Sequence, residues 1–289
     1  MSIATELTLL ANSKQAIKNS INQKGGSITD STPFADYSTA IDNLPSGGSG
    51  NPLLTSIDVS DFSGTTFNKA ANYITDVTIP SGVTRIAQEA LAYSSSLTTV
   101  TIPSGVTSIE QFAFYGCTSL TSITIPSSVR SIGTSAFNGC TSLTSITIPS
   151  GVSTINQDTF RECTSLSNIT IPSGVTSIGN SAFKSCTSLV NIIIPDTVIT
   201  IGQETFYGCT GLNSITIPSS VKSLGRSAFY MCNSLISIIV LRTTPPTIND
   251  YEFPDNNCPI YVPAESVETY KAASKWSSYA SRIQAIPTE

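Results

Sequence analysis

The sequence predicts an α/β solenoid, a rod of stacked 23-residue units with a parallel sheet on its concave side and helical or 3-10 turns on its convex side. Three features recur at this interval along the middle of the chain. Cysteine occupies Cys117, Cys140, Cys163, Cys186, Cys209 and Cys232. Phenylalanine occupies Phe114, Phe137, Phe160, Phe183, Phe206 and Phe229. An Ile-Pro pair begins at Ile102, Ile125, Ile148, Ile171, Ile194 and Ile217. A chain with such self-similarity folds as a stack in which neighbouring units bury one another's apolar side chains.

The apolar pattern inside one unit predicts a structure for each of its parts. Leu120, Ile123 and Ile125 alternate with polar residues and are rich in β-branching, which is typical of a strand with one buried face. Pro126 then ends the hydrogen-bonded ladder, because its nitrogen carries no proton. Residues 136–140 place Ala, Phe and Cys at the spacing of a single helical or 3-10 turn. The residues between these two parts are expected to carry the chain across the unit.

The complete unit, LxxIxIPxxVxxIxxxAFxxCxxL, resembles the leucine-rich repeat of the BspA or Treponema pallidum type. The resemblance covers about residues 74 to 240 and is near-complete in each unit. It implies a right-handed leucine-rich-repeat horseshoe. It also implies a non-catalytic binding or adhesion protein, which presents the repeat surface to a protein or glycan of a host or neighbouring cell. Such a role places the protein in the extracellular space or on the cell surface.

The chain divides into four parts by composition and pattern. Residues 1–45 predict a small helical module, and the Ser/Gly/Pro-rich residues 46–53 predict a flexible linker. The solenoid is expected over 54–240, and a carboxy-terminal cap over 241–289. Within the cap, "NCPIYVP" predicts a last strand, and the residues after it predict a helix that covers the open end of the stack.

The amino-terminal module resembles the amino-terminal segment of phage tail and prophage fibre proteins. This resemblance implies an alternative function, a virion-associated protein that is anchored by residues 1–45 and recognises a host bacterium with its repeats. The chain shows no signal peptide, since its first residues lack a basic start and an unbroken apolar stretch. A short amphipathic helix is marginal by itself, so the module is also expected to be capable of self-association.

Composition excludes several kinds of partner and chemistry. Charged residues make up only 11% of the chain, and the net charge is −5. Nucleic acid is therefore not expected as a partner, because binding it depends largely on Lys and Arg. No segment approaches the roughly 20 apolar residues of a membrane-spanning helix. The absence of histidine removes catalytic arrangements and zinc sites that need imidazole.

The remaining reactive side chains do not form a recognisable catalytic, cofactor or metal site. The six regular cysteines take one equivalent position per unit beside a phenylalanine, so we interpret them as small apolar core residues. Cys258 stands outside this register and is expected to be partly exposed without an evident partner. The carboxylates, among them Asp158 and Glu162, are scattered and are interpreted as solvated surface. The sequence thus predicts no enzyme, no cofactor and no metal site.

The residues between the inward positions of each strand predict a binding face. These positions carry hydroxyls and amides in most units, but Ile193 and Ile239 make the face apolar toward its carboxyl end. An exposed apolar group within a polar sheet is a contact patch, a residue that lies under the cap or an ordinary scattered apolar residue of the surface, and these interpretations stay open here. The candidate face consists of Ser145, Thr147, Asn168, Thr170, Asn191, Ile193, Ser214, Thr216, Ser237 and Ile239.

Overall fold

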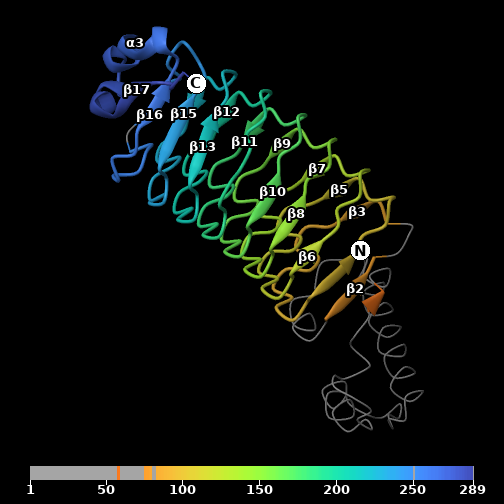
Figure 1. Ribbon diagram of the computed structural model, residues 1–289. Helices are drawn as coiled ribbons and strands as arrows, with labels where there is room; N and C mark the ends of the chain where they lie inside the picture. Colours follow the sequence, from red (N-terminus) through yellow and green to blue (C-terminus); the bar gives the residue numbers. More distant parts are fainter. Residues whose placement is uncertain (1–56, 59–74, 80–82, 250, 289) are drawn as a thin grey trace, which may run out of the picture.

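The computed structural model describes residues 57–58, 75–79, 83–249 and 251–288. They form an elongated solenoid whose strands stack side by side along the rod (Figure 1). Residues one repeat apart are direct ladder partners, since Ile146 pairs with Ile123 on one side and with Ile169 on the other. The predicted solenoid of 23-residue units with parallel strands is therefore confirmed. The predicted helical module 1–45 and linker 46–53 lie outside the described residues.

The first part of each unit forms a row of parallel strands, called row 1 below. Its side chains alternate between buried and exposed, as in β8, where Ile146 points inward between Ser145 and Thr147. Row 1 consists of β1 (Ile57–Asp58), β2 (Asp76–Thr78), β4 (Thr99–Thr101), β6 (Ser122–Ile123), β8 (Ser145–Thr147), β10 (Asn168–Thr170), β13 (Ser214–Ile217), β15 (Ser237–Val240), β16 (Ile260–Val262) and β17 (Ile283–Ala285).

A second row of parallel strands, row 2, forms where the sequence predicted only a segment that carries the chain across the unit. Each strand has two residues, of which the second is buried, as Ile132 is in β7. So short a strand shows no alternation in the sequence, which is why the pattern does not predict it. Row 2 consists of β3 (Arg85–Ile86), β5 (Ser108–Ile109), β7 (Ser131–Ile132), β9 (Thr154–Ile155), β11 (Ser177–Ile178), β12 (Thr200–Ile201) and β14 (Ser223–Leu224).

The two rows are interrupted at different rungs. Row 1 is divided between β4 and β6, where row 2 continues through β5 and β7. Row 1 also has no assigned strand at residues 191–194, between β10 and β13, although row 2 continues past this rung through β11 and β12. Row 2 is divided between β7 and β9, where row 1 continues through β6 and β8. Because the interruptions are staggered, at least one ladder links each rung to the next.

The segment opposite row 1 is a series of single turns, as the spacing of Ala, Phe and Cys predicted. Bonds of the 3-10 type are present, since the backbone N–H of Cys140 donates to the carbonyl of Phe137 at 3.2 Å. Ser135 (φ 54°) and Gly139 (φ 74°) adopt left-handed backbone conformations that end each turn. Their N–H groups donate instead to the following rung, from Ser135 to Gln157 O at 2.9 Å and from Gly139 to Arg161 O at 2.8 Å.

The core is a column of aromatic rings with thiols beside it. The six regular phenylalanines are fully buried, and successive rings lie 5.2–5.7 Å apart between centroids with planes within 11° of parallel. The six regular cysteines are also fully buried. Stacking identical units places like side chains over one another, so each ring packs against the ring of the next rung.

The carboxyl end closes this column with larger aromatic side chains. Phe253 stacks on Phe229 at 6.2 Å, and Trp276 follows it at 5.5 Å. Trp276 lies in η5 (Trp276–Arg282), which is preceded by η4 (Ala264–Ser266) and α3 (Val267–Ala272). The expected single helix is therefore broken, because Ala273 is extended and Lys275 has φ 66°. β17 follows β16, so β16 is not the last strand as the sequence predicted.

Candidate binding surface

The ten residues of the candidate face lie along the carboxy-terminal half of row 1. They come from β8, β10, the unassigned rung 191–194, β13 and β15. Inward isoleucines separate them along each strand, and the in-register parallel pairing aligns equivalent residues from rung to rung. Asn168 thus pairs with Ser145, and Thr170 pairs with Thr147. The structure therefore brings residues 23 positions apart in the sequence onto one surface.

Eight of the ten residues are exposed, and two are half-buried. The half-buried residues, Ser237 and Ile239, lie in β15, which is flanked on both sides by β13 and β16. Ile239 is in register with Tyr261, and its partner on the other side is Thr216. A large neighbour on the same face shields Ile239, so the outward exposure expected from the sequence is only partial there. Ile193, by contrast, is 83% exposed and lies under no cap.

The hydroxyls of the candidate face differ from those of another row of threonines on the surface. In the row Thr118, Thr141, Thr164 and Thr187, each Oγ1 donates to a backbone carbonyl of the previous rung at 3.2–3.4 Å. Those hydroxyls are therefore occupied by the protein itself. Within the described residues, the candidate-face hydroxyls make no such bond; they belong to the exposed Ser145, Thr147, Thr170, Ser214 and Thr216 and to the half-buried Ser237.

A shallow hollow of about 550 Å³ opens on this face around Ile193. Its lining combines apolar side chains, a carboxylate and hydroxyls. Asn191, Ile193, Ser214 and Thr216 belong to the predicted face, whereas sequence reasoning missed the other contributors. The sequence does mark two of them as departures from the repeat: Leu241 stands where other units have proline, and Asp196 stands where they have serine. The side chains used below are Ile193, Pro195, Asp196, Thr216, Pro218 and Leu241.

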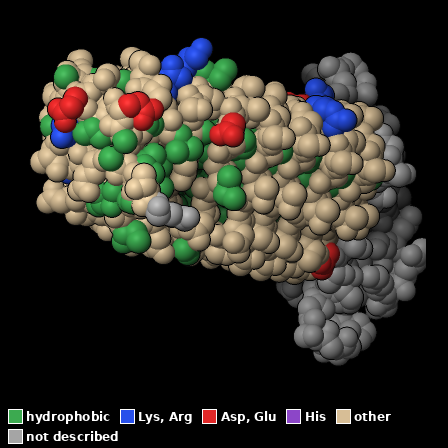
Figure 2. Space-filling model, turned by 45° about the horizontal axis from the view of Figure 1, so that its top comes forward, with side chains coloured by type: hydrophobic (Ala, Val, Ile, Leu, Met, Phe, Trp, Pro, Cys, Tyr) green, Lys and Arg blue, Asp and Glu red, His purple; other side chains and the backbone are tan. Residues whose placement is uncertain are grey.

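Apolar side chains gather toward the carboxyl end of the surface. Figure 2 shows a face on which most atoms belong to neutral polar side chains or backbone, with hydrophobic side chains concentrated in the half that includes the cap. Five large aliphatic side chains are at least 40% exposed in this half of the described chain: Val190, Ile193, Ile199, Ile236 and Leu241.

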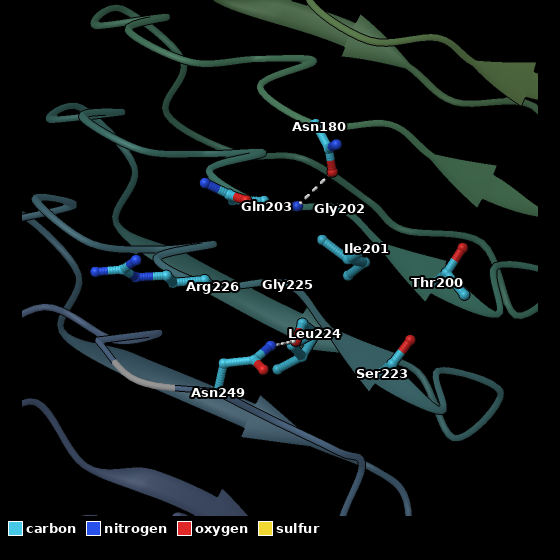
Figure 3. Close-up of a pocket in the computed structure, with 10 residues that line it drawn as sticks. All are labelled: Asn180, Thr200, Ile201, Gly202, Gln203, Ser223, Leu224, Gly225, Arg226 and Asn249. Atoms are coloured by element: carbon cyan, nitrogen blue, oxygen red, sulfur yellow. Dashed lines mark hydrogen bonds between the residues drawn. The ribbon is translucent and has the colours of Figure 1, made fainter.

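A second hollow lies on row 2 and is polar (Figure 3). Gly202 and Gly225 lie between the side chains of Gln203 and Arg226 on one side and those of Thr200 and Ser223 on the other. The Gln203 N–H donates to Asn180 Oδ1 at 2.8 Å, and Asn249 Nδ2 donates to Leu224 O at 3.5 Å. The amide groups at its margin thus already bind the protein's own backbone. Sequence reasoning did not identify this hollow, because it depends on side chains that are missing at glycine.

The regular cysteines are placed for packing and not for chemistry. Burial raises the pKa of the Cys117, Cys186 and Cys232 thiols to about 12. A thiol with so high a pKa carries almost no thiolate at neutral pH, and the thiolate is the form that attacks or binds metal. In the described part of the chain, no group of three or more Cys, Asp or Glu side chains is arranged to hold a metal ion.

Cys258 corrects the sequence interpretation. It was expected to be partly exposed and without a partner, but it is buried. Arg282, itself buried, donates from Nη2 to Cys258 Sγ at 3.2 Å and from Nε to Cys258 O at 2.9 Å. The partner comes from η5, 24 residues later, so no local pattern reveals the contact.

The scattered carboxylates also form structural contacts. Arg161 lies 3.7 Å from Asp158 and 3.2 Å from Glu162, so these two carboxylates share a cation. Lys184 pairs with Glu204 at 2.6 Å and lies 4.6 Å from the centre of the Tyr207 ring. The hydrogen bond from Lys184 is the main reason why the pKa of Glu204 is lowered. Among the described helices, none has the length and apolarity that crossing a membrane requires.

Comparison with known proteins identifies the repeat. The model of the BspA type leucine rich repeat region matches residues 60–190 and 176–274. No curated protein matches the sequence. A crystal structure of a leucine rich repeat protein from T. pallidum is 33% identical, covers 63% of this chain and 78% of its own, and has a TM-score of 0.47. A leucine rich cell surface protein from Faecalibacterium prausnitzii is 29% identical, with coverage of 82% and 69% and a TM-score of 0.47. The matched region spans most of the solenoid, and the chain belongs to the BspA-type leucine-rich-repeat family.

Proposed function

We propose that the protein is a non-catalytic binding protein that presents row 1 to a protein or glycan of another cell, from the cell surface or the extracellular space. One observation carries this proposal: five of the six hydroxyl residues of the candidate face are exposed, and none of the six side chains makes a hydrogen bond within the described residues. Exposed donors and acceptors on a rigid scaffold are what a partner needs for orientation and specificity.

The chemistry of the described residues favours binding over catalysis. The thiols of the regular cysteines are buried, and their high pKa keeps them protonated. Asp158 and Glu162 are engaged by Arg161, and Glu204 is engaged by Lys184. A rigid solenoid with a long, nearly neutral face suits contact with an extended partner better than it suits a reaction that needs an enclosed pocket.

The alternative of a phage tail protein depends on residues 1–45, which lie outside the described residues. The family match begins at residue 60 and does not bear on it. It stays a prediction of the amino-terminal sequence, and no observation on the described solenoid favours it over the first proposal.

The proposal is tested by binding of the full chain to a glycan array, to an array of extracellular-matrix proteins and to bacterial envelope fractions. We expect retention on at least one of these, and its loss when Thr147 and Thr170 are both replaced by arginine. Each arginine adds a bulky cation to the exposed face without touching the core.

The matched control is Ser173→Arg, which adds the same group at an exposed position outside the strands of row 1. This variant should bind as the wild type does. Failure of every array and fraction to retain the protein, or equal binding by the Thr147/Thr170 variant, would contradict the proposed role of row 1.

A further inference from the structure

Three departures from the repeat pattern converge on one hollow. At the second outward position of row 1, other units have threonine, as at Thr124, Thr147, Thr170 and Thr216, whereas the half-buried Ile239 takes this position in β15 and the exposed Ile193 takes it in the rung 191–194. After the Ile-Pro pair, six units have serine, but this rung has Asp196. Seven units have proline where the unit of β15 has Leu241. Ile193, Asp196 and Leu241 come from two different rungs, yet all three line the same hollow.

The exposure of Ile193 has no evident role in the fold, because its side chain is 83% exposed and buries little surface within the chain. Leu241 is 41% exposed, and its N–H donates to Ile217 O at 2.9 Å, a bond that proline cannot make. The rung that carries Ile193 is also the one at which row 1 lacks an assigned strand. An exposed aliphatic side chain in a row of threonines gains nothing in water, whereas it gains free energy when a partner covers it.

We infer that this hollow binds a peptide segment of another protein that places an aliphatic side chain between Ile193 and Leu241 and a Lys or Arg beside Asp196. The inference rests on the proposed function and specifies the partner of that face. Ile193, Pro195, Pro218 and Leu241 provide the apolar floor and walls, and Thr216 lies among them.

The charge of the hollow indicates which polar side chain the partner would place there. Asp196 is the one charged residue of the lining, is exposed, and makes no ion pair among the described residues. Arg242 follows the lining residue Leu241 in the sequence, but it donates from Nη1 to Ser219 O at 2.9 Å and does not line the hollow. A Lys or Arg of the partner would therefore meet an unpaired carboxylate next to the apolar contact.

An apolar floor without aromatic rings favours a peptide over a sugar. Sugar rings are usually bound against aromatic faces, and none of the residues that line this hollow is aromatic. Aliphatic side chains instead suit the apolar anchor of a peptide, around which hydroxyls such as Thr216 serve as rim hydrogen-bonding groups.

The experiment is selection of a phage-displayed random peptide library on the immobilised full chain, followed by fluorescence anisotropy with the synthesised peptides. We expect the selected sequences to combine Leu, Ile, Val or Met with an adjacent Lys or Arg. Their affinity should fall about tenfold for Ile193→Thr and by a smaller factor for Asp196→Ser, and the effect of Asp196→Ser should vanish at high salt. Both substitutions restore the residue of the other units, so they preserve the fold.

The matched control is Ile236→Thr, which removes an aliphatic side chain that is 72% exposed but lies outside the hollow. This variant should bind the peptides as the wild type does. Failure to enrich any peptide, enrichment of acidic or non-aliphatic peptides, or unchanged affinity of Ile193→Thr would each overturn the inference. So would a glycan from the array that loses binding on Ile193→Thr.

The two proposals fail in distinguishable ways. The Thr147/Thr170 variant changes rungs that do not line the hollow, so it tests the wider face alone. Array binding that depends on Thr147 and Thr170, without any peptide whose affinity depends on Ile193, would support the proposed function and contradict the inference about the hollow. Peptide binding that depends on Ile193, with no retention on the arrays or fractions, would support the hollow as a peptide site and contradict the proposed role of the wider face.

Discussion

The thiol of Cys163 donates a hydrogen bond to the backbone carbonyl of Phe137, 26 residues earlier in the chain, with 3.1 Å between the atoms. The same bond, over the same separation, recurs at all six regular cysteines, at 3.0–3.2 Å. Cysteine therefore does more than fill space. It packs as a small apolar residue and uses its weak S–H donor to tie each rung to the turn of the previous one.

Replacing Phe160 by alanine should lower the free energy of unfolding by about 3–5 kcal/mol, through the lost apolar transfer and the cavity that remains. Its ring is fully buried and stacks at 5.7 Å on Phe137 and at 5.5 Å on Phe183. Chemical denaturation measures the loss. Thr147→Ala, at an exposed position, is the control and should stay within about 0.5 kcal/mol of wild type. A loss below about 1 kcal/mol for Phe160→Ala would contradict the packing of this column.

Stability should fall at alkaline pH because of the buried thiols. Burial raises the pKa of Cys186 from 9.0 to about 12, so the folded state keeps a proton that the unfolded state releases. The corresponding stability is complete below pH 9 and is lost as the pH rises toward 12. Cys186→Ala should therefore reduce the slope of unfolding free energy against pH by about 1.4 kcal/mol per unit in this window.

The measurement is denaturant unfolding at a series of pH values for both proteins. Thr187→Ala, which removes a neighbouring group that does not titrate, should leave the slope unchanged. An identical slope for wild type and Cys186→Ala would show that this thiol ionises equally in both states.

Gly202→Ala should destabilise the protein by about 1–3 kcal/mol, because the added methyl group overpacks a rigid backbone contact. A Cβ at this position would lie 2.6 Å from the backbone N of Asn180 and 2.6 Å from the carbonyl carbon of Gly179. Thermal or chemical unfolding measures the change.

Gly151→Ala is the matched control for Gly202→Ala. The atoms nearest to its Cβ would belong to the side chain of Arg130, at 2.6 Å. That exposed side chain is held only by hydrogen bonds from Nη1 to Ser127 O and Val129 O, so it shifts at a lower cost than backbone does. We expect a change within about 0.5 kcal/mol. Equal effects of the two substitutions would show that rungs do not approach closely along the glycine row.

Ser94→Ala should stabilise the protein by about 1 kcal/mol, because a buried hydroxyl without a partner costs free energy that a methyl group does not. Ser94 takes the place of the regular cysteines, is fully buried, and its Oγ has no hydrogen-bond partner among the described residues. Ser95→Ala, at the exposed neighbouring position, should leave the unfolding midpoint unchanged. Destabilisation by Ser94→Ala would indicate that the hydroxyl is bonded.

The periodic part of this protein could be predicted because its physics is local and repeated. The alternation of Leu120, Ile123 and Ile125 predicts a strand, and repetition of that strand 23 residues later predicts its neighbour. The candidate face follows from the same alternation, since a residue between two inward isoleucines points outward. The two-residue strands of row 2 and the left-handed residues of the turns leave no comparable periodicity.

The sequence alone determined which side chains lie in the core and which face outward, because identical units in register bury identical positions. Only the tertiary structure decided where the exceptions meet. Ile193 and Leu241 share one hollow although 48 residues separate them, and Cys258 is covered by Arg282 from the cap. Because the units stack, residues that are far apart in the sequence lie only a few rungs apart in space. A residue that departs from the pattern therefore lies beside residues of other units, which the sequence of its own unit does not reveal.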